Sequence, residues 1–158
     1  RLKAMMELYE WRSWPGFFPI EYRMIPAVEG AAFLQLDGLE IVASPVKHLL
    51  PTMGIRVSFK NIQKTVTYSS DTEPCEEVVR LAKGADILIH ESAGSSIGHS
   101  SARQAGEVAS KAGAKSLYLI HYPAHVTKQE LIQEAQSAYS GPVFVCEDFM
   151  EIDLIRGS

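Results

Sequence analysis

In the first half of the chain, short apolar runs stand in pairs on either side of turn residues. Asp37-Gly38 separates one pair, and Asp-Gly is a strong hairpin signal because glycine accepts the positive φ that a tight turn needs. Lys60-Asn61 separates a second pair. Helical spacing of apolar residues over 2–9 predicts one helix before them. The first half is therefore predicted to be mostly antiparallel strand, over 33–36, 39–42, 55–59 and 62–68.

From Asp71 onward, helix signals alternate with short apolar runs. Gly84 and Gly113 are typical of helix ends. Thr127 begins a third helix, because Glu130 three residues later completes a capping box. The apolar runs between and after the helices predict strands over 87–90, 117–120, 143–145 and 149–154. The predicted fold class is α/β, with antiparallel strands first and alternating helix and strand after them.

The length and composition indicate one ordinary domain. The chain has 158 residues, of which 46% are hydrophobic and 22% charged, as in soluble globular proteins. The domain is placed at residues 1–155, because residues 156–158 could be a cloning remnant. A net charge of −4 lowers the expectation of nucleic-acid binding without excluding a local basic patch. No apolar run approaches the roughly 20 residues that span a bilayer, and the two cysteines lack disulfide spacing. A cytoplasmic protein with no membrane partner is predicted.

Four polar residues stand beyond apolar runs or beside turns: His48, Asp71, His99 and His121. In α/β folds, ligands bind where strands end, because the loops there converge on a rigid edge. Imidazole and carboxylate groups are ligands of borderline divalent metals. If the four side chains meet at one edge of the sheet, this pattern predicts metal-assisted hydrolysis.

Each of these residues also has a purely structural interpretation. Asp71 could cap a helix or a turn, His99 could belong to a helix cap, and a lone histidine is more often a surface residue than a ligand. His90 could support a ligand or simply end its strand. Glu91 could orient a catalytic imidazole by accepting its ring N–H, or be an exposed charge. The coincidence of several such residues favours the metal site.

Five short segments carry a more specific signal. They are His-Leu-Leu-Pro-Thr-Met-Gly-Ile-Arg (48–56), Tyr-Ser-Ser-Asp-Thr (68–72), His-Glu-Ser-Ala (90–93), Gly-His-Ser-Ser with the residues up to Gly106 (98–106) and Leu-Ile-His-Tyr (119–122). In this order they resemble the second half of the metallo-β-lactamase superfamily, specifically its ribonuclease Z-like branch. The resemblance implies half of a metallo-β-lactamase αββα sandwich as the fold.

The resemblance also implies roles for individual residues. His48 and His121 would bind metal, and Asp71 would bridge two metals. His99 would be a catalytic acid that protonates the leaving group or holds the scissile phosphate, with Glu91 nearby. Two divalent ions, zinc first and manganese or iron as alternatives, would supply a metal-activated hydroxide that hydrolyses a phosphodiester.

The sequence departs from the family pattern. The signature His-x-His-x-Asp-His does not occur in it and would lie upstream of Arg1. We therefore expect the C-terminal half of the fold, with too few ligands to hold two metals firmly, so that the chain alone could be inactive. An isolated half would expose sheet edge and apolar surface, which favours a homo-oligomer or pairing with the missing N-terminal half. The family's glycine in the aspartate motif is Ser70 here.

A second departure concerns the substrate. Ribonuclease Z carries a long insert that grips transfer RNA, whereas only 15 positions separate Arg56 from Asp71 here. A small phosphodiester or another ester is expected, and transfer RNA is not. Three alternatives stay open: hydrolysis of a lactone, sulfate ester or thioester on the same scaffold, an inactive or self-associating interaction module, and vestigial metal ligands.

Overall fold

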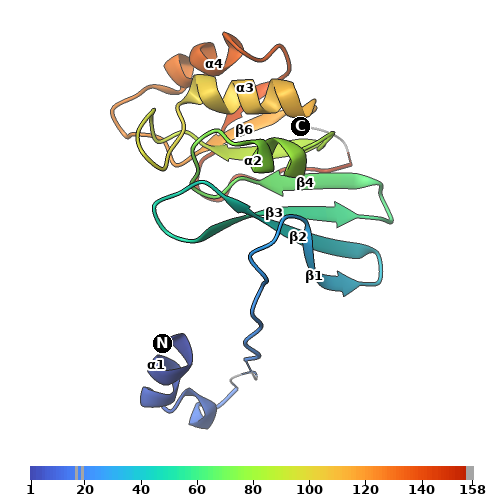
Figure 1. The fold of residues 1–158 in the computed structure, drawn as a ribbon, viewed down its shortest axis with the longest axis vertical. Helices are drawn as coiled ribbons and strands as arrows, with labels where there is room; N and C mark the ends of the chain where they lie inside the picture. The colour runs from blue at the N-terminus through green and yellow to red at the C-terminus, as the bar shows by residue number, and fades with distance from the viewer. Residues whose placement is uncertain (17, 19, 156–158) are drawn as a thin grey trace.

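The computed structural model describes residues 1–16, 18 and 20–155, so residues 156–158, the suggested cloning remnant, lie outside the described part. Seven strands form one sheet in chain order (Figure 1). They are β1 (Ala31–Leu36), β2 (Leu39–Val46), β3 (Thr52–Phe59), β4 (Lys64–Tyr68), β5 (Ile87–Glu91), β6 (Leu117–Ile120) and β7 (Val143–Val145). Pairing is antiparallel from β1 to β4 and parallel from β4 to β7. The predicted α/β fold class and order of elements are confirmed.

Both predicted hairpins are present. Leu36 pairs with Leu39 across a two-residue turn in which Gly38 has a φ of +74°. Phe59 pairs with Lys64 across the second turn. The third strand begins at Thr52, three residues earlier than the sequence predicts.

The predicted strand over 149–154 is wrong. These residues form no strand. Instead, Ile152 and Leu154 line a cavity of about 290 Å³ together with Tyr118 and Phe144 of the parallel strands. Ile152 and Leu154 therefore lie against a face of the sheet, and they do not extend its edge.

Three helices pack on one face of the sheet: α2 (Glu76–Leu81), α3 (Ala102–Ala112) and α4 (Lys128–Gln136). Capping boxes begin α3 at Ser101 and α4 at Thr127, because each side chain accepts a bond from the backbone amide three residues later. Helices α3 and α4 approach closely, since a Cβ at Gly106 would clash with the carbonyl oxygen of Ala135. The small inner face of α3 lets it lie close to its neighbours.

The sheet is apolar on both faces. Leu88 and Leu119 belong to the core beneath the helices. Successive side chains of a strand point to opposite faces, so Ile89 points away from the helices, as do Val66 and Val57 in the neighbouring strands. These three are only half-buried, and among the described residues no helix packs against them. Apolar side chains on both faces are typical of a sheet that lies between two layers.

The N-terminal segment stands apart from this body. It contains α1 (Leu2–Leu8) and a 3₁₀ helix, η1 (Trp11–Ser13), and Figure 1 shows both away from the sheet. In the described ranges, no helix is long and apolar enough to cross a membrane.

Candidate metal centre

The topology brings four chain segments to one edge of the sheet. Strands β4, β5 and β6 are parallel, so the residues that follow them emerge at the same edge. Strand β2 is antiparallel to β3, and β3 to β4, so β2 ends at this edge too. His48 follows β2, Asp71 follows β4, His99 lies in the loop after β5, and His121 directly follows β6.

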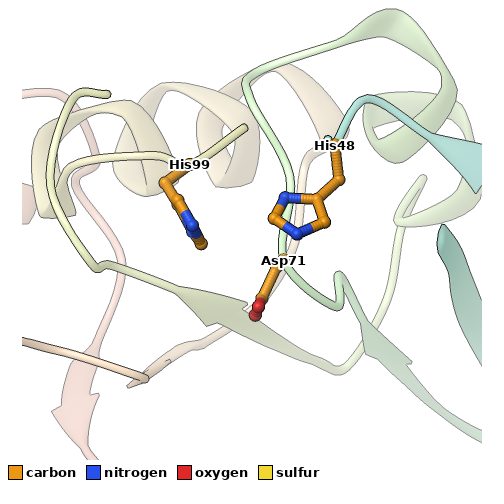
Figure 2. Close-up of side chains that lie close together, drawn as sticks. All are labelled: His48, Asp71 and His99. Carbon is orange, nitrogen blue, oxygen red and sulfur yellow. The ribbon is translucent and has the colours of Figure 1, made fainter. Parts of the chain in front are cut away.

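Each of the four side chains lies close to at least two of the others. The His121 Nδ1 is 3.0 Å from Oδ1 of Asp71. The ring of His99 stands between the other two imidazoles, with centroids 5.0 Å from His48 and 5.4 Å from His121. Figure 2 shows His48 and His99 on either side of the Asp71 carboxylate. The side chains of Asp71 and His121 are 37% and 49% exposed, so this group is open to solvent.

The donor set fits a divalent metal. Ligand atoms of His48, Asp71 and His99 lie within 4.8 Å of one another, and those of Glu91, His99 and His121 do the same. Imidazole nitrogens and carboxylate oxygens suit borderline cations such as zinc. The buried Nδ1 of His99 has no hydrogen-bond partner among the described residues. Oε1 of Glu91 lies 3.3 Å from this nitrogen, so Nδ1 faces a carboxylate and the metal fit rests on the chemistry of the donor set.

The geometry differs from the predicted ligand set in one respect. Neither group contains His48, Asp71 and His121 together, and His99 belongs to both. Asp71 shares one group with His48 and contacts His121 directly. Asp71 therefore lies between the two predicted histidine ligands, and His99 lies beside both.

Glu91 is completely buried at the end of β5, so its interpretation as an exposed strand-end charge is wrong. Its Oε1 accepts the backbone amides of Thr72 (3.2 Å) and Ser100 (2.8 Å), and its Oε2 accepts the amide of Ala93 (2.8 Å). Oε1 also lies 3.3 Å from Nδ1 of His99. One carboxylate thus holds the ends of three segments around the site.

His90 lies outside the cluster. Its ring is fully buried, and its Nδ1–H donates to the carbonyl oxygen of Glu91 at 2.7 Å. Burial lowers the pKa of His90 below the ordinary histidine value, so the ring is neutral. Its Nε2 has no hydrogen-bond partner in the described part of the chain. His90 therefore supports the backbone of Glu91 and is not placed as a ligand.

Two turn residues at this edge adopt strained backbone conformations. Ser70 has a φ of +54° and His121 a φ of +48°, in the left-handed region that side chains rarely occupy. The Ser70 hydroxyl donates to the carbonyl oxygen of Met53 at 2.8 Å, which helps to hold this turn. Strained residues collect at functional sites. Here Ser70 directly precedes Asp71, and His121 is in contact with it.

The sequence did not single out Glu73 as a site residue, and it noted Gly98 only as part of a motif. Gly98 accepts a hydrogen bond from His48 and donates its amide to Glu73. No local sequence pattern predicts these bonds, because His48 lies 50 positions from Gly98 and Glu73 lies 25 positions from it.

The fold and the cluster define an α/β domain with a candidate metal centre at the ends of its strands. The family described as "Beta-lactamase superfamily domain" matches residues 8–122. The chain therefore belongs to this family, and the resemblance to ribonuclease Z-like metallo-β-lactamase proteins is confirmed.

A ribonuclease Z sequence is similar to part of this chain, and two solved structures share its fold. A ribonuclease Z of Methanothermobacter thermautotrophicus is 44% identical over 97 residues, which are 56% of this chain and 32% of that protein. The metallo-β-lactamase fold protein YhfI from Bacillus subtilis superposes with a TM-score of 0.72 at 24% identity, covering 92% of this chain and 60% of that one. Human tRNase Z, short form, superposes with a TM-score of 0.63 at 23% identity, covering 80% of this chain and 47% of that one. The chain spans less than half the length of the curated relatives it matches, 45% at most among those compared.

Proposed function

We propose that this chain supplies half of the active site of a metal-dependent hydrolase that acts on a phosphodiester. The observation that carries the proposal is the meeting of His48, Asp71, His99 and His121 at one edge of the sheet. Membership of the superfamily supports a metal-dependent hydrolase, and the similarity to a ribonuclease Z supports a phosphate ester as substrate.

Two divalent ions are proposed at this edge, zinc before manganese or iron. Asp71 would bridge them, with His48 on one side and His121 on the other. Bound ions generate a nucleophile from water near neutral pH and neutralise the charge that develops on the substrate. Since three ligands are too few to hold two ions firmly, the proposed complete site also needs a segment with the His-x-His-x-Asp-His pattern.

His99 is proposed as the catalytic acid. It lies beside both metal-binding histidines, where its ring can reach a substrate bound between them. The buried carboxylate of Glu91, 3.3 Å from Nδ1 of His99, would orient the ring. A proton on the opposite nitrogen of His99 could then pass to the leaving oxygen.

The substrate is proposed to be a small phosphodiester. The separation of 15 positions between Arg56 and Asp71 leaves no room for a long RNA-gripping insert. The similarity to a ribonuclease Z keeps RNA as a candidate substrate. Transfer RNA is therefore tested as a competing substrate. A lactone, sulfate ester or thioester would be the next candidates on the same scaffold.

The half-covered sheet favours a second candidate function, an interaction module. Val57, Val66 and Ile89 form part of an apolar face against which no helix of the described ranges packs. Either an upstream segment of a longer protein or a second copy of this chain could cover it. In the second case the chain would self-associate, and its metal site could be vestigial.

The experiment compares this chain with a longer protein that includes the upstream signature. Metal content is measured by mass spectrometry, turnover with a chromogenic phosphodiester and with transfer RNA, and mass in solution by light scattering. Two metals and turnover in the longer protein, both lost in Asp71→Ala, are the expected result. Absence of metal from both proteins, with this chain dimeric, would favour the interaction module.

A further inference from the structure

The loop after β5 contacts His48 directly through Gly98. The Nδ1 of His48 lies 2.7 Å from the carbonyl oxygen of Gly98. A carbonyl oxygen only accepts, so the proton of the neutral ring must be on Nδ1. Nε2 is then the nitrogen with a free lone pair, and Figure 2 shows the ring directed toward Asp71. This bond therefore leaves the correct nitrogen available for a metal.

Gly98 is itself held by a carboxylate that the proposed reaction does not use. The Gly98 amide donates to Oε1 of Glu73 at 3.0 Å. The other oxygen, Oε2, pairs with Nζ of Lys47 at 2.6 Å, and the Glu73 amide donates to the Lys47 carbonyl oxygen at 2.8 Å. Lys47 directly precedes His48. Glu73 thus ties together the two segments whose contact fixes the imidazole.

Position 98 has no room for a side chain. A Cβ there would lie 2.8 Å from Nδ1 of His48 and 3.2 Å from Cγ of Leu49. The φ of Gly98 is +84°, which favours glycine over any residue with a side chain. The residue is buried, so an added side chain would have to displace His48 or Leu49.

We infer that Gly98 and Glu73 are positioning residues for His48. The Gly98 carbonyl holds the imidazole in the Nδ1–H tautomer with Nε2 toward Asp71, and Glu73 fixes Gly98 through its amide. Histidine ligands commonly donate the second ring N–H to a backbone carbonyl, and loss of such support lowers metal affinity by about 10–100-fold. The inference rests on the proposed function insofar as His48 is taken as the ligand being positioned.

The test uses the metal-free chain labelled with ¹⁵N-histidine. Long-range ¹H–¹⁵N spectra at about pH 8, where an ordinary imidazole is neutral, report which ring nitrogen carries the proton. His48 is expected in the Nδ1–H form. If the spectrum instead shows the Nε2–H form in the unaltered chain, the inference is overturned without reference to any variant.

Three variants separate positioning from general damage. Glu73→Ala should give mixed tautomers at His48 and about 10–100-fold weaker zinc binding. Glu73→Gln should keep the tautomer, because its amide oxygen can still accept from Gly98. Glu76→Ala, an exposed glutamate three residues away, should behave as the unaltered chain, and amide dispersion checks that each variant is folded.

An unchanged tautomer and unchanged zinc affinity in folded Glu73→Ala would remove Glu73 from the inference. If every form fails to bind zinc while His48 shows the expected tautomer, the proposed metal function fails and the hydrogen-bond assignment stands. The two failures are therefore distinguishable.

Discussion

Replacement of Glu91 by glutamine should destabilise the protein even though the side chain keeps its size. Glu91 accepts three backbone amides, two buried ones at Oε1 and a part-buried one at Oε2. Glutamine has one acceptor oxygen, so it can keep the two bonds from Thr72 and Ser100, but its NH₂ group would then face the amide of Ala93. One bond is lost, and the other two are no longer charge-assisted.

The size of the effect follows from these bonds. A hydrogen bond to a charged group contributes about 1.5–3 kcal/mol, and a neutral one is about half as strong. Relief from burying a charge offsets part of the loss. We expect the free energy of unfolding to fall by about 2–4 kcal/mol, which for a chain of this length lowers Tm by about 5–15 °C.

Urea unfolding followed by far-ultraviolet circular dichroism is the appropriate assay. Tryptophan fluorescence is not, because Trp11 and Trp14 belong to the N-terminal segment that stands apart from the sheet. The matched control is Glu107→Gln, which removes only a solvent-facing pair with Arg103 and should cost no more than about 0.5 kcal/mol. Equal stabilities for Glu91→Gln and this control would refute the assigned role of the carboxylate.

Three further predictions use other parts of the structure. His99→Ala in the longer, active protein should lower turnover about 10²–10⁴-fold with metal content intact, and an unchanged rate would remove His99 from the mechanism. Burial raises the pKa of Asp86, but the bond from Lys115 and other favourable contacts outweigh it and leave the pKa lowered. The stability that Asp86 contributes is present above the unfolded pKa of about 3.9 and lost as the pH falls through the lower folded pKa. Asp86→Asn should therefore lower the free energy of unfolding at pH 7. In urea titrations at acidic pH, this variant should also lose less stability than the unaltered chain as the pH falls. Gly106→Ala should lower Tm, because overpacking against Ala135 costs about 1–3 kcal/mol and the helix-propensity gain is about 1 kcal/mol; a higher Tm would contradict the close approach of α3 and α4.

Local signals explain why much of the fold could be predicted from the sequence. Gly38 marks its hairpin because the turn needs a positive φ, and Thr127 with Glu130 marks a helix start because the two side chains and backbone amides satisfy each other. The tail over 149–154 misled the prediction for a physical reason. Ile152 and Leu154 are apolar because they cover a face of the sheet, and periodicity alone does not distinguish this from strand pairing.

The candidate site was predictable where chemistry and strand ends coincide. Asp71 and His121 directly follow short strands or their turns, so topology alone brings them together. The burial of Glu91 and the support from Glu73 and Gly98 could not be predicted in the same way. They depend on which backbone groups meet across the folded edge, and the spacing of residues along the chain contains no such information.

The most direct test of the central claim is anomalous X-ray diffraction at the zinc edge from crystals of the longer protein grown with zinc. The account predicts two anomalous peaks, one in contact with His48 and Asp71 and one in contact with Asp71 and His121, and the loss of both peaks in Asp71→Ala crystals. A peak at any other site, or none at all under saturating zinc, would contradict the claim that these three residues bind the metal.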